Sequence, residues 1–213
     1  KLLQITDTIV PPLKQKITVP VLIWISEQEW LTGNAEEYLL YNPLKKNYRP
    51  FGKNDFTGRE QRLIFHYFDE KNQWLYFSNY YNGLFRYSTD GRLLYRWERG
   101  LVPDKIPDAN ISFLFPRNDS TIWIGGAENG GLMILNTVSN RFTQLTHNNN
   151  FSTSLAANSL IYYYLDNARN EWISTTAGVS KLAAATRIIN TWREVLPGIT
   201  AADELVSVQK GAD

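Results

Sequence analysis

A tryptophan-centred segment recurs along this chain, at Trp30, Trp74, Trp123 and Trp172. The spacings between successive tryptophans are 44, 49 and 49 residues. A repeat of roughly 40 to 50 residues that contains several short strands is typical of a β-propeller blade. The sequence therefore predicts an all-β fold built from blades of four antiparallel strands, with about four blades in the chain.

Each copy of the repeat consists of four β-prone runs separated by turn residues. In the third copy the runs are ISFLF, TIWIGGA, GLMIL and RFTQLT, with polar turns at 116–120 and 128–130. Asn, Asp and Gly in such turns supply the backbone angles that hairpins require. The first copy is the most degenerate, because no glycine precedes its third run. The predicted blades cover residues 18–51, 60–99, 109–146 and 157–193.

The repeated tryptophans are interpreted as structural. Large flat side chains in a strand fill the wedge between stacked sheets, so we expect these rings to be buried. The alternative, a sugar-stacking platform, requires an exposed ring. The glycines at Gly83, Gly131 and Gly178 precede the third run and are expected to mark the end of a hairpin turn.

Charge and hydropathy exclude several classes of partner. The 22 basic residues nearly balance the 21 acidic ones, and no basic run is present, which argues against nucleic-acid binding. The longest apolar run, at residues 19–25, is far shorter than the roughly 18 residues that a membrane-spanning helix needs. The absence of cysteine excludes disulfides and thiolate metal sites.

An ordered motif occupies the stretch from His147 to Leu182. Its matching positions are His147, Ser154-Leu155, Asn158, Leu160, Asp166, Trp172-Ile173 and Gly178-Val179. The preceding unit repeats it in part, at Gly100-Leu101, Asn110, Ile111, Trp123-Ile124-Gly125 and Gly131-Leu132. This motif resembles the two-component regulator propeller repeat of bacterial hybrid sensor histidine kinases. The resemblance covers roughly residues 60 to 193, and Glu171 and Ser174 depart from the pattern at structural positions.

The resemblance implies a function. In that family such propellers are extracytoplasmic sensors that belong to much longer chains carrying a membrane span, a histidine kinase and often a DNA-binding regulator. It implies that this segment is not itself an enzyme and needs no cofactor. It also implies a periplasmic or extracellular location, a nutrient ligand such as an oligosaccharide, and adjoining blades, signalling modules and a homodimer as partners.

The ends of the chain suggest additional strands. Residues 203–210 read like the opening strand of another blade, and residues 1–10 read like the closing strand of an earlier one. We therefore expect a piece of a larger propeller, of the seven-bladed type, or a small ring closed by the terminal strands. Unpaired sheet edges would favour association between copies.

Catalytic and metal-binding constellations are sparse. His66 lies in a predicted inner strand and His147 in a loop, and no known hydrolase or metalloprotease motif surrounds them. A core or loop-bracing role is the simpler interpretation of both. The acidic residues fall mostly in turns, as Asp119 and Asp166 do, without the alternating oxygen ligands of a calcium loop. No metal site is predicted.

The loops at one end of the blades are the candidate ligand site. Loops that join the second and third strands emerge on the same face as the connections between blades. Their amide, carboxylate and aromatic groups suit a polyhydroxylated ligand. The candidate residues are Asn79, Tyr80, Tyr81, Asn82, Glu128, Asn129 and His147.

Two other functions stay open at this point. A propeller lyase would use His66 or His147 as a general base, beside a carboxylate at the mouth of the channel. A scaffold that binds other proteins would show an exposed apolar patch.

Overall fold

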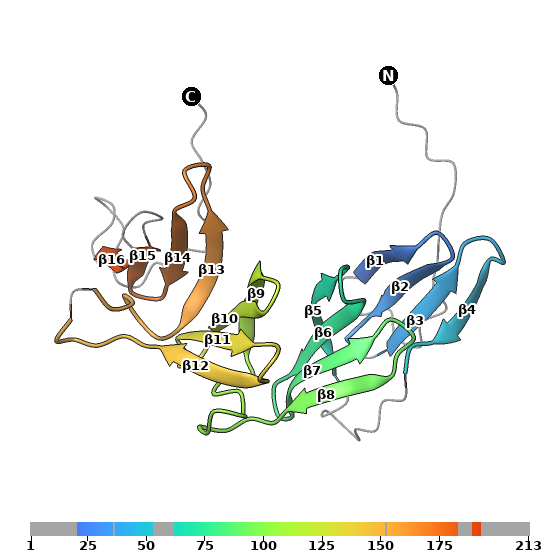
Figure 1. Ribbon diagram of the computed structural model, residues 1–213, viewed down its shortest axis with the longest axis horizontal. Coiled ribbons are helices and arrows are strands. Elements are labelled where there is room, and N and C mark those ends of the chain that lie inside the picture. Colours follow the sequence, from blue (N-terminus) through green and yellow to red (C-terminus); the bar gives the residue numbers. More distant parts are fainter. Residues whose placement is uncertain (1–20, 36, 53–61, 152, 183–188, 193–213) are drawn as a thin grey trace. The chain divides into compact units, whose positions relative to one another are not determined.

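The computed structural model describes residues 21–35, 37–52, 62–151, 153–182 and 189–192. The expected strands at 1–10 and 203–210 lie outside this part of the chain. Within the described residues, all regular secondary structure is β, which confirms the predicted all-β class (Figure 1). The strands are β1 (Val21–Ser26), β2 (Glu29–Asn34), β3 (Glu37–Asn42), β4 (Asn47–Pro50), β5 (Ile64–Asp69), β6 (Trp74–Asn79), β7 (Gly83–Ser88), β8 (Leu93–Trp97), β9 (Ile111–Asn118), β10 (Thr121–Gly126), β11 (Leu132–Asn136), β12 (Arg141–Leu145), β13 (Leu160–Leu165), β14 (Glu171–Thr175), β15 (Gly178–Leu182) and β16 (Ile189–Trp192).

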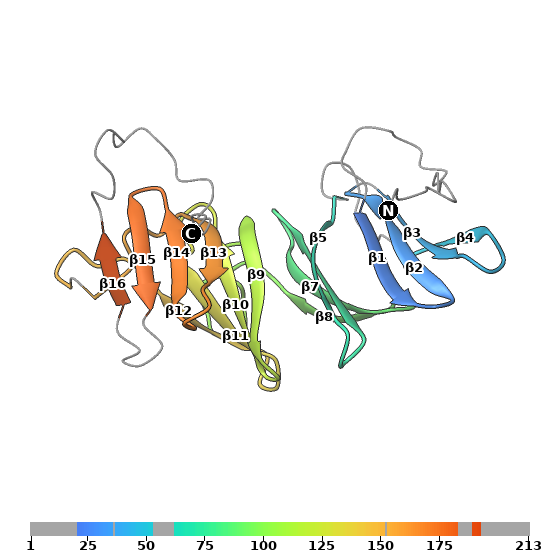
Figure 2. The ribbon, with the colours of Figure 1, turned by 90° about the horizontal axis from the view of Figure 1, so that it is seen from above.

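Each copy of the repeat forms one four-stranded sheet whose strands lie side by side in chain order. We call these sheets 1 to 4 in the order of the sequence. Every strand pair with a recorded register is antiparallel, as expected for neighbours joined by short turns. Figure 2 shows sheet 4 with β13 to β16 side by side. The four sheets are the blades of a β-propeller.

The chain divides into two compact units, and the division passes through sheet 2. Among the described residues, the first unit comprises those up to residue 79 together with 85–95, and the second comprises 80–84 together with those from residue 96 onward. The first contains sheet 1 with most of sheet 2, and the second contains sheets 3 and 4.

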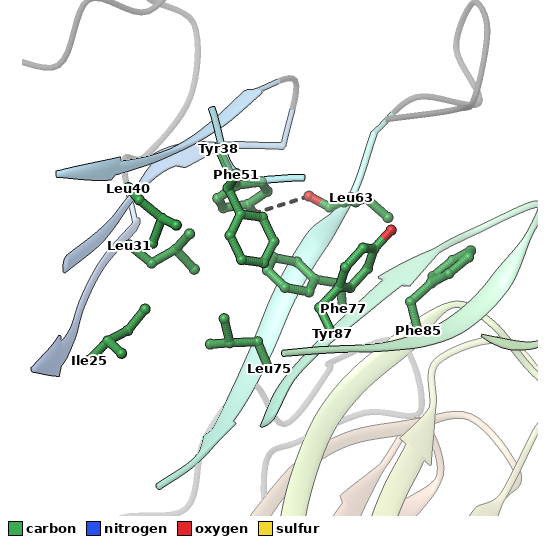
Figure 3. Packing of buried hydrophobic residues seen from close by; sticks show 10 residues of the cluster. All are labelled: Ile25, Leu31, Tyr38, Leu40, Phe51, Leu63, Leu75, Phe77, Phe85 and Tyr87. Carbon is green, nitrogen blue, oxygen red and sulfur yellow. Dashed lines mark hydrogen bonds between the residues drawn. The ribbon is translucent and has the colours of Figure 1, made fainter. Parts of the chain in front are cut away.

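An aromatic core joins sheets 1 and 2 in the first unit. The ring of Phe77 contacts Tyr38, Phe51, Phe65 and Tyr87, with centroid distances of 5.0 to 5.5 Å. Figure 3 shows Tyr38 and Phe51 from the first copy pointing toward Phe77 and Tyr87 from the second. The contact with Phe51 is tilted and the other three are edge to face. Aromatic contacts of these kinds stabilise a core beyond the burial of their area.

Tyr38 also ties the two sheets together by hydrogen bonds. Its hydroxyl donates to the carbonyl of Leu63 at 3.1 Å (Figure 3). It also accepts the amide N–H of Phe65 at 3.2 Å. Burial raises the pKa of Tyr38 to about 12, so the hydroxyl keeps its proton at neutral pH. These two bonds hold the beginning of β5 against β3.

A second core joins sheets 3 and 4. Trp123, Leu132, Leu155, Leu160, Tyr163 and Ile173 form a buried cluster. The ring of Tyr163 lies 4.4 Å from Phe115 and 6.1 Å from Trp123, measured between centroids. Trp123 is therefore an inter-sheet residue, as its place in the repeat predicts.

The other repeated tryptophans differ from the expectation of burial. Trp30, Trp74 and Trp172 are only half-buried, whereas the aliphatic residue that follows each of them is at most 3% exposed. The second and fourth copies place a cation over the indole. The Cζ of Arg86 lies 4.2 Å from the centroid of the Trp74 ring, and the Nζ of Lys181 lies 4.8 Å from that of Trp172. These rings are partly covered by charged side chains because a cation on an aromatic face is attracted to it.

The first copy also differs in register. In sheet 3, Trp123 stands opposite Ile134 and faces the core with sheet 4. In sheet 1, Trp30 stands opposite Tyr41, and it is Leu31, opposite Leu40, that enters the core with sheet 2. Because side chains alternate along a strand, a shift of one residue turns the tryptophan to the other face.

The position at the start of the third strand requires glycine for steric reasons. Gly83 has a φ of 103°, and the corresponding Gly131 and Gly178 have φ values of 60° and 134°. A Cβ atom at Gly83 would collide with the carbonyl oxygen of Trp97 on the neighbouring strand. Both effects restrict the position to glycine.

Candidate functional site

Two short turns of the second unit carry most of the predicted ligand-binding residues. The turn between β6 and β7 contains Tyr80, Tyr81 and Asn82, and the turn between β10 and β11 contains Glu128 and Asn129. The two turns lie 48 residues apart in sequence but meet in space, because the hydroxyl of Tyr80 donates to Oε1 of Glu128 at 2.8 Å. The structure therefore brings these predicted residues together.

Arg99 completes this contact. Its Nη2 lies 3.1 Å from Oε2 of Glu128, and its guanidinium lies 5.4 Å from the centroid of the Tyr80 ring. Glu128 thus accepts from a phenol on one oxygen and from a guanidinium on the other. The hydrogen bond to Glu128 is the main cause that raises the pKa of Tyr80. We call Tyr80, Tyr81, Arg99 and Glu128 the loop site.

Aromatic surface is available at the loop site. Tyr81 is 59% exposed and Tyr80 is 39% exposed. The two rings meet edge to face with their centroids 4.9 Å apart. Asn82 lies next to them and accepts a hydrogen bond from Arg96 at 3.3 Å, measured to its Oδ1. A ligand would therefore meet a ring face flanked by a guanidinium and a carboxylate.

A buried carboxylate shapes the turn that presents Glu128. Asp108 is 2% exposed, and its Oδ2 accepts the backbone N–H groups of residues 128, 129 and 130 at 3.0, 3.3 and 3.2 Å. Its Oδ1 accepts the N–H of Asn110 at 2.9 Å. Successive N–H groups that converge on one point form an anion-binding concavity, and the protein fills this one with its own carboxylate.

The carbonyl groups of the same turn are bound as well. Gln144 donates to the carbonyl of Gly130 at 2.6 Å, and the hydroxyl of Ser159 donates to the carbonyl of Glu128. The N–H of Gly131 donates to the carbonyl of Asn158 at 2.8 Å. Bonds to its N–H and C=O groups hold the turn rigidly, which pre-organises the side chain of Glu128 for a ligand.

Asn79 does not belong to the loop site, which corrects the prediction. Its side chain is 2% exposed, and Nδ2 donates to the carbonyl of Arg62 at 2.7 Å. As the last residue of β6, it holds the chain that leads into β5. A buried amide that is bound to the backbone serves the fold rather than a ligand.

His147 braces the connection between sheets 3 and 4. Its Nδ1 lies 2.6 Å from the carbonyl oxygen of Leu155, and its Nε2 lies 2.9 Å from Oδ1 of Asn149. Its backbone N–H donates to Oδ1 of Asn158 at 2.6 Å. Both ring nitrogens have partners within this loop, so the geometry favours the bracing role.

His66 lies on β5 with its Nε2 2.7 Å from the hydroxyl of Ser78. Burial lowers the pKa of His66 to about 4, so the imidazole is neutral at pH 7. A neutral imidazole can act as a base, but a pKa this low makes it a weak one. The low pKa of His66 and the two ring partners of His147 therefore do not favour either residue as a general base.

Metal ligands do not gather in the described part of the chain. There, no group of three or more His, Asp and Glu side chains could hold a metal ion. The carboxylate of Asp166 instead accepts from the backbone N–H and the side-chain amide of Asn170 and from Nε1 of Trp172. These bonds lower the pKa of Asp166 to about 2, the one from Trp172 contributing most.

Sequence reasoning missed Arg99 and Asp108. Arg99 follows β8 without any motif around it, and Asp108 lies in a loop 20 residues before the first turn amide that it binds. The signal that was available is the preference of Asp for capping free N–H groups, but it does not say which turn is capped.

Among the described residues, no helix is long and apolar enough to cross a membrane.

Comparison with known proteins shows likeness in structure only. No protein-family model and no curated protein matches the sequence. Two similar solved structures are extracellular domains of hybrid two-component systems from B. thetaiotaomicron, with TM-scores of 0.55 and identities of 18% and 16%. The matches cover 77% and 80% of this chain, and the chain spans 22% and 23% of the length of those domains.

A third similar structure is the virginiamycin B lyase from Staphylococcus aureus. Its TM-score is 0.57 at 14% identity, and the match covers 87% of this chain and 59% of the lyase. At these identities the comparisons establish the fold. The chain has a β-propeller architecture, and the similar structures include both extracellular domains and an enzyme, so the fold alone does not decide the function.

Proposed function

We propose that this chain is the extracytoplasmic, ligand-sensing segment of a two-component system propeller, and that it recognises an oligosaccharide. The observation that carries the proposal is the loop site, where two exposed tyrosines lie beside an arginine and a carboxylate that a buried aspartate holds in place. Support also comes from the resemblance of the repeat to sensor propellers and from the likeness to two extracellular domains of hybrid two-component systems.

The loop site has the chemistry that a sugar requires. The faces of pyranose rings are apolar and stack on aromatic rings such as that of Tyr81, which is 59% exposed. The hydroxyl groups of a sugar both donate and accept, so they match a carboxylate and a guanidinium that lie 3.1 Å apart. An acidic sugar would be drawn to Arg99, and a neutral one would share both groups.

Signalling requires that the ligand distinguish two arrangements of the protein. A ligand shifts an equilibrium only by its differential affinity for the two states. Tyr80 and Glu128 come from different sheets, so a sugar bound to both would favour the arrangement in which they meet. A kinase module and a homodimer that respond to this shift stay predictions.

The test is a binding screen of neutral and acidic oligosaccharides by thermal shift, followed by calorimetric titration. A ligand that prefers the native state raises the melting temperature by mass action. Tyr81→Ala and Glu128→Gln should each weaken the affinity for the sugar found, with about a three- to tenfold loss for the stacking ring.

The matched control is Val138→Ala. Val138 is 79% exposed and lies in the turn between β11 and β12, at the opposite end of sheet 3 from Glu128. This substitution should leave sugar affinity unchanged. Saturable binding that is equally insensitive to the loop-site variants and to the control would refute the loop site as the sensor surface, and the absence of any binding would argue for a scaffold.

A further inference from the structure

A cavity of about 800 Å³ lies between sheets 3 and 4, within the second unit. Its walls are mainly apolar and include Trp123, Leu155 and Ile173. This volume is in the range of sites that enclose small molecules, which are mostly apolar with a few polar groups. The residues of the loop site do not line it.

The cavity extends both along and across the strands of sheet 3. Leu132 lines one end and stands opposite Gly125 of β10, whereas Asn118 lines the other end and stands opposite Thr121. These positions on β10 are four residues apart, which corresponds to about 13 Å along a strand. Its lining residues come from all four strands of sheet 3, so the cavity is about as wide across the strands as it is long.

One end of the cavity carries a charge that is already balanced. The Nη2 of Arg117 lies 2.6 Å from Oε1 of Glu171, and the side chain of Arg117 is 45% exposed while that of Glu171 is 2% exposed. The guanidinium also lies 5.6 Å from the centroid of the Trp123 ring. A guanidinium has five N–H donors, so one ion pair does not exhaust its capacity.

The neutral ion pair selects the charge of a ligand. A second anion at Arg117 would meet the carboxylate of Glu171, which already neutralises the guanidinium, so it gains less attraction there than at an unpaired arginine. An uncharged oxygen can accept a hydrogen bond from the guanidinium and does not depend on this attraction.

We propose that the cavity is a second ligand site, which binds an uncharged, largely apolar molecule with an oxygen that accepts a hydrogen bond from Arg117. The apolar part lies along Trp123, Ile173 and the leucines of the two sheets. The proposal is independent of the function of the loop site, because the two sites share no residue.

The test uses the neutral fluorescent probe N-phenyl-1-naphthylamine, with 1-decanol and decanoate as competitors at pH 8. The probe should bind saturably, and 1-decanol should displace it about tenfold more effectively than decanoate. Leu145→Trp places a large side chain into the cavity from a position that is 40% exposed, so it should abolish probe binding without unfolding the chain.

Leu93→Trp is the matched control, because Leu93 is 47% exposed on β8 and does not line the cavity. It should leave probe binding unchanged. Equal binding by the wild type and both tryptophan variants would overturn the proposal, as would the absence of probe binding to the wild type.

Glu171→Gln tests the role of the ion pair itself. The amide keeps the shape of Glu171 and a hydrogen-bond acceptor for Arg117 but removes the negative charge. Decanoate should then gain about tenfold relative to 1-decanol, because the arginine is no longer compensated. An unchanged ratio of the two affinities would show that Arg117 does not contact the end of the ligand.

Discussion

Substitution of Asp108 by asparagine should destabilise the second unit more than any surface substitution near it. The carboxylate is 2% exposed and accepts four backbone N–H groups, three of them on Oδ2. An amide of the same shape has only one oxygen. If that oxygen faces the turn at 128–130, the amide nitrogen meets the N–H of Asn110, and two donors oppose each other.

The magnitude follows from these bonds. A hydrogen bond to a charged group contributes about 1.5–3 kcal/mol and a neutral one about 0.5–1.5 kcal/mol. The three bonds on Oδ2 share one atom, so we expect their weakening to cost about 1–2 kcal/mol in total. The orphaned N–H of Asn110 adds about 1–2 kcal/mol, which gives about 3 kcal/mol for Asp108→Asn.

Urea denaturation followed by tryptophan fluorescence measures this loss, with Trp97 and Trp123 as buried reporters. Amide hydrogen exchange at residues 128–130 should accelerate in parallel, because their acceptor is weakened. The control is Asp104→Asn, at an exposed position of the same loop, which should change stability by less than about 0.5 kcal/mol. A loss below about 1 kcal/mol for Asp108→Asn, with unchanged exchange, would refute the assigned role of the carboxylate.

Further predictions concern residues outside the loop site. His66 has a folded pKa of about 4 against 6.5 for the free side chain, so the unfolded state binds the proton first as the pH falls. The free energy of unfolding should therefore drop by about 3 kcal/mol between pH 6.5 and pH 4, and His66→Gln should flatten this decline in urea titrations. Tyr38→Phe leaves a carbonyl and an amide without the hydroxyl that bridges them and should lower stability by about 1–3 kcal/mol; a calorimetric change within error would contradict this. Gly83→Ala should cost about 2 kcal/mol or more, because φ is 103° and the Cβ would collide with backbone, and Gly100→Ala, whose Cβ meets only the flexible side chain of Lys105, should cost less in the same denaturation assay.

The features that sequence alone could predict are local ones. Asn and Gly indicate turns such as 128–130, and runs of aliphatic and aromatic residues indicate the strands beside them. The position of Tyr80 and Glu128 in equivalent turns of successive repeats was enough to place them on one face, and the structure joins them by a hydrogen bond.

The features that sequence could not supply depend on contacts between distant residues. The register of β2 against β3 decides which face Trp30 takes, and a repeat pattern does not encode a shift of one residue. Asn79 has the composition of a turn residue but is drawn into the fold by a carbonyl 17 residues away. Glu171 differs from the residue that the repeat has at this position, and the structure explains the difference by its ion pair with Arg117 on the neighbouring sheet.

The way in which Asp108 holds the turn at 128–130 has an evolutionary consequence. The carboxylate binds main-chain N–H groups, which every residue except proline possesses, rather than the side chains of Glu128 and Asn129. Those side chains can therefore be exchanged while the path of the backbone is preserved. Such a propeller can acquire a new ligand by substitutions at the tip of this turn, because the buried carboxylate of Asp108 maintains the backbone conformation.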